Sequence, residues 1–200
     1  IRDRFILIGI SCSAELKAQK NGTVYKGNDP AVRYTGRTLV SPDGSVAFDW
    51  VGTYLETRFT GGKLSVKVSE TGTSYYNVFV DGKLHKVVKV CGTDTLIHLV
   101  SGIDKRIHSL KIQKRSEGEF GKTTVHQFVL SGSGRLAEEP AVRTRHIEFI
   151  GNSLTCGYGT DGKHRDEPFL VETENCNLTF ASMVARYYDA DYTPVSYTHL

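Results

Sequence analysis

The stretch IEFIGNSLTCGYG, at residues 147–159, decides how the last third of the chain is expected to fold. Its opening residues, 147–150, have the length and the apolar composition of a buried strand. Gly151 and Gly157 supply the backbone freedom that a sharp turn needs. Ser153 is therefore expected at the carboxyl end of a strand, where α/β sheets bind their ligands. A serine hydroxyl held there acts as a nucleophile once a base reaches it.

The composition of the 200-residue chain is that of an ordinary globular protein. Hydrophobic residues make up 39% and charged residues 24%, while 20 glycines and 10 tyrosines favour β-structure with many turns. The net charge of +3 is small and the basic residues are scattered, which argues against nucleic-acid binding. No apolar run reaches the roughly 20 residues that a transmembrane span needs.

The first residues have the pattern of an exported protein. Charged residues at 2–4 precede an apolar run at 5–10, and small residues follow at 11–14. This order is typical of the end of a secretory signal peptide. We therefore interpret residues 1–20 as a signal-peptide remnant and expect a secreted, periplasmic or cell-surface protein. Cys12 is also a candidate lipid-anchor site, and a short buried strand is the alternative for this segment.

Short β-type runs alternate with turns over residues 21–135. The period-two alternation at 64–68 is typical of a half-buried strand. Asp81-Gly82 separates two β-type runs and predicts a hairpin. The number and spacing of these runs, with no helical period among them, predict a β-sandwich. The expected strands are 54–59, 64–68, 75–80, 84–90, 95–100, 106–114 and 123–130.

A different pattern begins after a linker at residues 136–144, where charged residues and a proline mark a domain boundary. Over residues 145–200 an expected strand and a charged loop precede an amphipathic helix. This order predicts the first β–loop–α unit of a parallel α/β domain. The expected buried face of the helix consists of Leu178, Ala181, Ala185 and Tyr188, and its expected cap is Asn175 or Asn177.

Several separated segments resemble carbohydrate esterase family two, a branch of the SGNH (GDSL-like) hydrolases that includes acetyl xylan esterases. Residues 151–159 resemble the first SGNH motif block, and residues 172–178 resemble the segment that opens the first catalytic helix. The resemblance, which covers about residues 32–192, implies an N-terminal all-β jelly-roll sandwich followed by the start of a flavodoxin-like α/β hydrolase domain. The segments that resemble the family's sandwich are 33–37, 47–50, 75–82 and 114–118.

The resemblance implies an enzyme that removes O-acetyl groups from acetylated plant polysaccharide or oligosaccharide, with no cofactor and no metal. Ser153 would attack the acetyl carbonyl, form an acyl-enzyme and offer its backbone N–H to the oxyanion. Gly151 and Asn152 would set the geometry of the loop. The family's later Gly, Asn and general-base His are not recognised here, and the sequence departs from the family after Tyr192. We therefore interpret the chain as C-terminally truncated and expect it to be a poor catalyst or none.

Several residues keep two interpretations at this stage. Cys156 and Cys176 flank the expected site and are either a disulfide or, the favoured interpretation, buried free thiols. The aromatic residues Trp50, Tyr54, Tyr75 and Tyr76 either pack in the core or stack on sugar rings.

Two groups of charged residues are predicted to be solvated: those at 114–119 near a strand end, and Asp161, His164 and Asp166 on a loop near the expected site. None of the histidines in the chain is favoured as the general base. A non-catalytic carbohydrate-binding sandwich is the alternative function.

Overall fold

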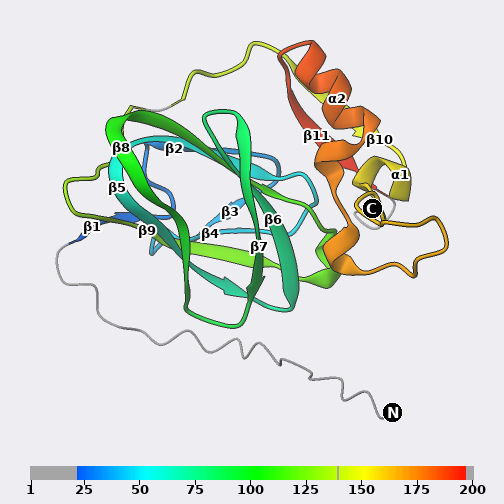
Figure 1. Ribbon diagram of the computed structural model, residues 1–200, viewed down its shortest axis with the longest axis horizontal. Coiled ribbons are helices and arrows are strands. Elements are labelled where there is room, and N and C mark those ends of the chain that lie inside the picture. The colour runs from blue at the N-terminus through cyan, green and yellow to red at the C-terminus, as the bar shows by residue number, and fades with distance from the viewer. Residues whose placement is uncertain (1–21, 139, 197–200) are drawn as a thin grey trace, which may run out of the picture.

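The computed structural model of the protein describes residues 22–138 and 140–196 (Figure 1). The expected signal-peptide remnant at 1–20 and the candidate lipid anchor at Cys12 lie outside these residues. Within the described ranges, no helix combines the length and the apolar character that crossing a bilayer would require.

The first part of the chain forms nine strands, whose hydrogen-bonding order is β3-β4-β9-β5-β8-β6-β7, with β1 added beside β9 and β2 beside β5. A short 3₁₀ turn, Gly118–Phe120, links β8 to β9. The strands are β1 (Gly22–Lys26), β2 (Val32–Thr35), β3 (Leu39–Val40), β4 (Val46–Phe48), β5 (Tyr54–Glu70), β6 (Thr73–Val80), β7 (Lys83–Cys91), β8 (Thr95–Lys114) and β9 (Thr123–Ser131).

The long strands β5 and β8 lie side by side in the middle of the strand order of this β-sandwich (residues 22–136). Each was expected as two short strands, but each is continuous and the two pair with one another along their length. The glycines at 61 and 62 lie at shifts in the pairing register. These glycines therefore mark a bulge and a bend inside β5, whereas the sequence predicted that one strand ends there and another begins. The Asp81-Gly82 hairpin between β6 and β7 is confirmed.

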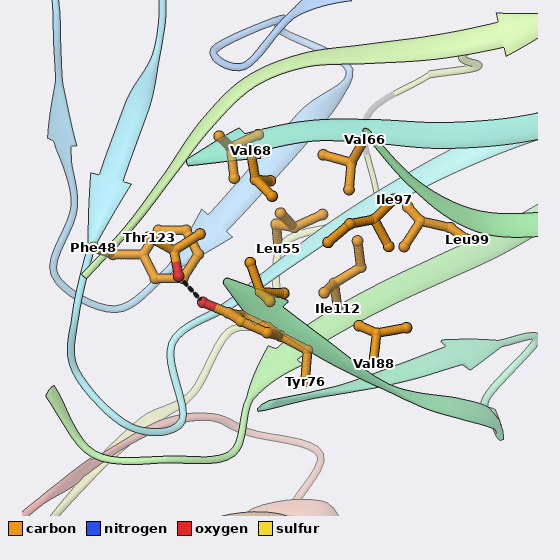
Figure 2. Close-up of a pocket in the computed structure, with 12 residues that line it drawn as sticks. Phe48, Leu55, Val66, Val68, Tyr76, Val88, Ile97, Leu99, Ile112 and Thr123 are labelled. Carbon is orange, nitrogen blue, oxygen red and sulfur yellow. Dashed lines mark hydrogen bonds between the residues drawn. The ribbon is translucent and has the colours of Figure 1, made fainter. Parts of the chain in front are cut away.

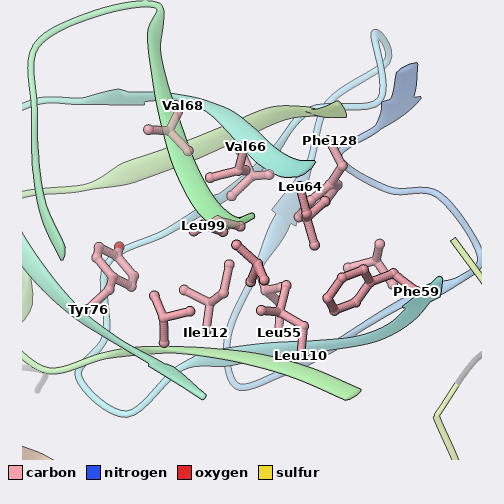
Figure 3. Packing of buried hydrophobic residues seen from close by; sticks show 14 of the residues in the cluster. Leu55, Phe59, Leu64, Val66, Val68, Tyr76, Leu99, Leu110, Ile112 and Phe128 are labelled. Carbon is pink, nitrogen blue, oxygen red and sulfur yellow. The ribbon is translucent and has the colours of Figure 1, made fainter. Parts of the chain in front are cut away.

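The hydrophobic core lies between the two layers of the sandwich (Figure 3). Phe59, Leu64 and Phe128 are fully buried in it and come from β5 and β9. At one end of the core, Tyr76 and Thr123 hydrogen-bond through their hydroxyl groups beside Phe48 (Figure 2). These two buried hydroxyl groups therefore satisfy one another, as buried hydroxyls require.

The second part of the described chain is an α/β unit (residues 145–196). Strand β10 (His146–Ile150) pairs in parallel with β11 (Asp191–Val195). Between them lie α1 (Ser153–Cys156), the 3₁₀ turns η2 (Val171–Thr173) and η3 (Cys176–Leu178), and α2 (Phe180–Tyr187). The predicted strand–loop–helix order is confirmed.

The predicted buried face of the helix is confirmed at its centre and wrong at both ends. Ala181 and Ala185 are buried as expected, but Leu178 is 41% exposed and Tyr188 51% exposed. Leu178 belongs to η3, and Tyr188 is the C-cap residue that follows α2. Asn175 caps η3 by accepting a hydrogen bond from the backbone N–H of residue 177, so it does not cap α2 itself.

The α/β unit packs against one end of the sandwich (Figure 1). Two small apolar clusters join the parts: Val51 with both cysteines of the unit, and Tyr54 with Ala185 and Tyr192. A two-stranded sheet is marginal by itself in water. Burial against the sandwich supplies the apolar contacts that this pair of strands lacks.

A buried ion cluster fixes the same contact at the start of β11. The carboxylate of Asp191 accepts hydrogen bonds from Arg33 of β2 at 2.7 Å, from Arg143 at 2.8 Å and from the Tyr54 hydroxyl at 2.5 Å. Glu56 of β5 bonds both arginines. Burial would raise the pKa of Asp191, but the hydrogen bonds from Arg33, Tyr54 and Arg143 outweigh it and lower the pKa to about 2.

Candidate active site

Ser153 lies at the sharp turn that follows β10. The backbone N–H of Gly151 donates to the Val195 carbonyl at 2.9 Å, which continues the pairing of β10 with β11. Asn152 is extended, and its side chain accepts from the Leu154 N–H at 3.1 Å. Ser153 then opens α1. The structure thus places the serine at the carboxyl end of a parallel strand, as the sequence predicted.

Two glycines make this tight turn possible. A Cβ on Gly151 would lie 2.1 Å from the Thr155 hydroxyl oxygen, so no larger residue fits there. Gly157 ends α1 with a φ of +85°, and a Cβ on it would lie 2.4 Å from the Asn175 carbonyl oxygen. Left-handed backbone of this kind strongly favours glycine. The predicted role of Gly151 in loop geometry agrees with this close approach.

The reactive groups of Ser153 are open to a ligand. Its side chain is half-buried, and no described residue hydrogen-bonds to its hydroxyl or accepts from its backbone N–H. By contrast, the backbone N–H groups of Leu154 and Thr155 donate to the side-chain and backbone oxygens of Asn152. In the described ranges no histidine hydrogen-bonds to Ser153 either. The geometry can therefore supply a nucleophile and one oxyanion donor, but the described residues supply no base beside them.

Replacing Asn152 with alanine is expected to lower the free energy of unfolding by about 1 kcal/mol, because α1 loses its side-chain cap. Asn152→Asp keeps an accepting oxygen and should retain most of that stability. Urea denaturation of both variants measures the difference. Equal losses in the two variants would mean that the cap contributes nothing.

A partly exposed aromatic stack begins at Tyr158, five residues after Ser153. The rings of Tyr158 and Phe169 are parallel within 9° and their centroids lie 3.5 Å apart, and Phe120 of the sandwich adds a third ring at 5.7 Å. The backbone N–H of Tyr158 donates to the Ser153 carbonyl, which ties the stack to α1. Sequence reasoning missed these residues because Phe169 sits in an irregular loop with no periodicity. Flat rings of this kind suit the apolar faces of sugars.

The four aromatic residues that the sequence offered for sugar stacking do not belong to this aromatic stack. Tyr54 and Tyr76 are buried, so stacking on a ligand is ruled out for both. Trp50 is half-buried, with the Arg37 guanidinium 4.0 Å from its ring centroid. Tyr75 donates its hydroxyl to Glu172 at 3.3 Å.

A buried polar network lies behind α1 and joins it to the sandwich. The Cys156 thiol donates to the Glu117 carboxylate at 3.0 Å, and the Glu117 N–H donates to the Glu174 carboxylate at 3.1 Å. The expected surface position of the charges at 114–117 is therefore wrong, since the docked α/β unit covers them. Cys156 and Cys176 are both free and buried, which confirms the favoured interpretation and excludes their pairing.

Burial shifts the proton equilibria of this network. It raises the pKa of Glu174 to about 8, with the Glu117 carboxylate adding to the rise, and lowers the pKa of Lys114 to about 8. The candidate ligand atoms of Glu117, Cys156 and Glu174 lie within 4.8 Å of one another, close enough for one metal ion. The Cys156 thiol already hydrogen-bonds to Glu117, however, and burial raises its pKa. The Cys156 thiol therefore keeps its proton, while Glu174 Oε1 has no hydrogen-bond partner among the described residues.

Wild-type stability is expected to fall as the pH rises from about 5 to 8. The folded pKa of Glu174 is about 8 and its ordinary value is 4.5, so the native state holds a proton in this window that the unfolded chain has lost. Glu174→Gln should flatten this dependence, whereas the exposed Glu148→Gln should not. Urea unfolding at several pH values tests this, and the same slope in all three proteins would contradict it.

Arg115 fixes the loop that follows α1. Its guanidinium donates to the backbone carbonyls of Glu174 at 2.9 Å and Glu172 at 3.0 Å, and pairs with Asp161. Asp161 is therefore a structural partner, while His164 and Asp166 are exposed as predicted.

Comparison with known proteins identifies relatives for most of the chain. The family model "Carbohydrate esterase 2 N-terminal" matches residues 34–140. The cellulase/esterase CelE of Acetivibrio thermocellus is 31% identical over 171 residues, which are 86% of this chain and 21% of that protein. An acetylxylan esterase / glucomannan deacetylase of Cellvibrio japonicus is 30% identical over 78% of this chain and 44% of its own length.

Solved structures agree with these relatives. A family two carbohydrate esterase from Clostridium thermocellum, in complex with cellohexaose, has a TM-score of 0.77 at 32% identity, over 80% of this chain and 49% of that one. A family two carbohydrate esterase from Cellvibrio japonicus has the same fold, with a TM-score of 0.76 at 24% identity over 86% and 51% of the two chains. The chain thus spans about half the length of these solved relatives and less than half of the curated ones.

Proposed function

The chain belongs to the carbohydrate esterase 2 family, and from this premise we propose that the protein carrying it removes O-acetyl groups from plant polysaccharides. The observation that carries the proposal is the position of Ser153. Its hydroxyl and its N–H are both unengaged by described residues, at the end of a parallel strand. A binding module has no need of such a turn.

In the proposed reaction, Ser153 Oγ attacks the acetyl carbonyl as a base takes its proton. The backbone N–H of Ser153 stabilises the oxyanion. The same proton then passes to the departing sugar oxygen as the ester C–O bond breaks, and water hydrolyses the acetyl-enzyme to acetate. We place the base, a histidine, and the remaining oxyanion donors outside the described residues, because no described histidine hydrogen-bonds to Ser153.

The proposed organisation follows the sequence expectations. A jelly-roll sandwich at 21–135 and a linker at 136–144 precede the beginning of an SGNH hydrolase domain at 145–200. The parallel β10–β11 pair, with its helices between the strands, supports this arrangement. Export to the cell surface, the periplasm or the medium is proposed from the pattern at 1–20, with Cys12 as the candidate lipid anchor.

The names of the relatives support the substrate class. Acetylxylan and glucomannan appear in the name of the Cellvibrio japonicus relative. The aromatic stack of Tyr158 and Phe169, which a backbone hydrogen bond ties to Ser153, offers a surface for sugar rings. The alternative is a non-catalytic carbohydrate-binding sandwich, which the cellohexaose complex of the Clostridium thermocellum relative favours.

Acetate release from acetylated xylan and acetylated glucomannan tests the proposal, with a phospholipid and an acyl thioester as control substrates. We expect release from the polysaccharides, and preference for either control would overturn the proposed substrate class. The 200-residue chain by itself is expected to be a poor catalyst. If the 200-residue chain were as active as a longer protein that also supplies a histidine base, the base would have to lie within this chain. Retention of unacetylated glucan without any acetate release would favour the binding module.

A further inference from the structure

A second cavity lies at the opposite end of β10 from Ser153. It has a volume of about 530 Å³ and opens between strands β5 and β8 of the sandwich on one side and the linker and α2 on the other. Arg143, which lines it, comes three residues before β10, whereas Ser153 comes three residues after that strand. A smaller cavity of about 130 Å³ shares four lining residues with it: Lys111, Arg143, Asn177 and Arg186. The volume is in the range of about 300–1,000 Å³ that is usual for small-molecule sites.

The lining of the larger cavity carries an excess of positive charge. Its cationic side chains are Arg58, Lys111, Arg143 and Arg186, and its carboxylate is Glu56. Glu56 already bonds Arg33 and Arg143. Asp189, on the smaller cavity, pairs with Arg143 at 3.3 Å, as does Asp191 at 2.8 Å. The carboxylates at the two cavities therefore form their salt bridges with Arg143 and Arg33.

Three of the cations have no carboxylate partner among the described residues. Arg186 donates to the backbone carbonyl of Asn177 at 3.1 Å and to its side-chain oxygen at 3.0 Å, both neutral acceptors. The Lys111 ammonium lies 3.7 Å from the centroid of the Tyr54 ring. No salt bridge within the described ranges involves Arg58, Lys111 or Arg186.

Lys111 shows the electrostatic consequence. Its pKa is lowered to about 8: burial is the main cause, Glu56 opposes the fall and the neighbouring Arg143 adds to it. A lysine that loses water without gaining an anion behaves in this way. An anion in the cavity would offset that loss and would give each guanidinium a charge-assisted, bidentate partner.

We propose that this cavity binds a small ligand carrying an oxyanion, a carboxylate or a phosphate, held by Lys111, Arg186 and Arg58. The side chain of Asn177 provides a neutral polar group for the rest of the ligand. Two sources share this chemistry: a free anion in solution, and an acidic sugar unit bearing a carboxylate. The site is separate from Ser153 and does not depend on the proposed esterase activity.

Calorimetric titration of the unaltered chain at low ionic strength tests the proposal, with inorganic phosphate, glucuronate and neutral glucose as probes. We expect phosphate or glucuronate to bind with a dissociation constant below about 10 mM, which corresponds to roughly −2.7 kcal/mol, and glucose not to bind. Glucuronate binding at least tenfold tighter than phosphate identifies an acidic sugar, and equal affinities identify a free oxyanion. Failure of both anions to bind overturns the proposal.

Variants locate the site. Lys111→Gln and Arg186→Gln should each weaken the binding by about tenfold, whereas Lys122→Gln, an exposed cation elsewhere on the sandwich, and Ser153→Ala should leave it unchanged. A second measurement avoids dependence on variants: in the unaltered protein, the bound anion should raise the pKa of Lys111 above about 8, as read from its side-chain NMR shifts. Anion binding that leaves this pKa unmoved and is equal in all variants would place the anion elsewhere.

Discussion

Ser153→Ala is expected to lower kcat/KM for acetyl-ester hydrolysis by at least about 10⁴-fold in a protein that carries this chain together with the general base. The variant removes the only atom that can form the acetyl-enzyme in the proposed mechanism. It keeps the backbone N–H that binds the oxyanion, so a small residual rate should survive. KM should change little, because the aromatic stack of Tyr158 and Phe169 is untouched.

The control for this experiment is Ser101→Ala, which removes an exposed serine from β8 of the sandwich. It should retain full activity. Mass spectrometry adds a direct readout, since an activated acetyl ester should transiently add one acetyl group to the unaltered protein and none to Ser153→Ala. Activity within tenfold of the unaltered protein in Ser153→Ala would rule out the serine as nucleophile.

The turn around Ser153 was predictable because its signals are local. An apolar run, two glycines and a small polar residue at the start of α1 lie within 13 consecutive residues and act on one another directly. The close contact of Gly151 with Thr155 is of the same kind, as is the left-handed Gly157. Such features need no knowledge of the rest of the fold.

The buried charges were not predictable for the opposite reason. Lys114, Arg115 and Glu117 follow a strand and read as solvated residues, yet their partners lie 40 or more positions away in the α/β unit and in β6. Only the docked arrangement covers them. The glycines at 61 and 62 were misread similarly, because pairing of β5 with β8 determines whether the chain turns or bends there.

Asp191→Asn is expected to lower the free energy of unfolding by about 3 kcal/mol, a large loss for a near-isosteric change. Asp191 accepts hydrogen bonds from Arg33, Arg143 and Tyr54, and its side chain is only 7% exposed. Removing one charge from such a cluster leaves Arg33 and the partly exposed Arg143 with less compensating charge, and breaking a buried ion pair costs about 3–5 kcal/mol. The loss should be measured by urea denaturation at neutral pH.

The pH dependence of stability, compared between the unaltered chain and Asp191→Asn, distinguishes a charge effect from a packing effect. The folded pKa of Asp191 is about 2 and its ordinary value is 3.8, so its contribution is complete above pH 4 and is lost as the pH falls towards 2. Unfolding of the unaltered chain should therefore become easier over that window, and Asp191→Asn should show less of this change.

Asp94→Asn serves as the matched control, because Asp94 is exposed and pairs with Lys67 at 3.3 Å on the surface. It should cost less than about 1 kcal/mol. If Asp191→Asn cost no more than Asp94→Asn, the ion cluster would not hold the α/β unit against the sandwich. The apolar contacts of Tyr54 with Ala185 and Tyr192 would then carry that role, and Ala185→Ser would be the more damaging change.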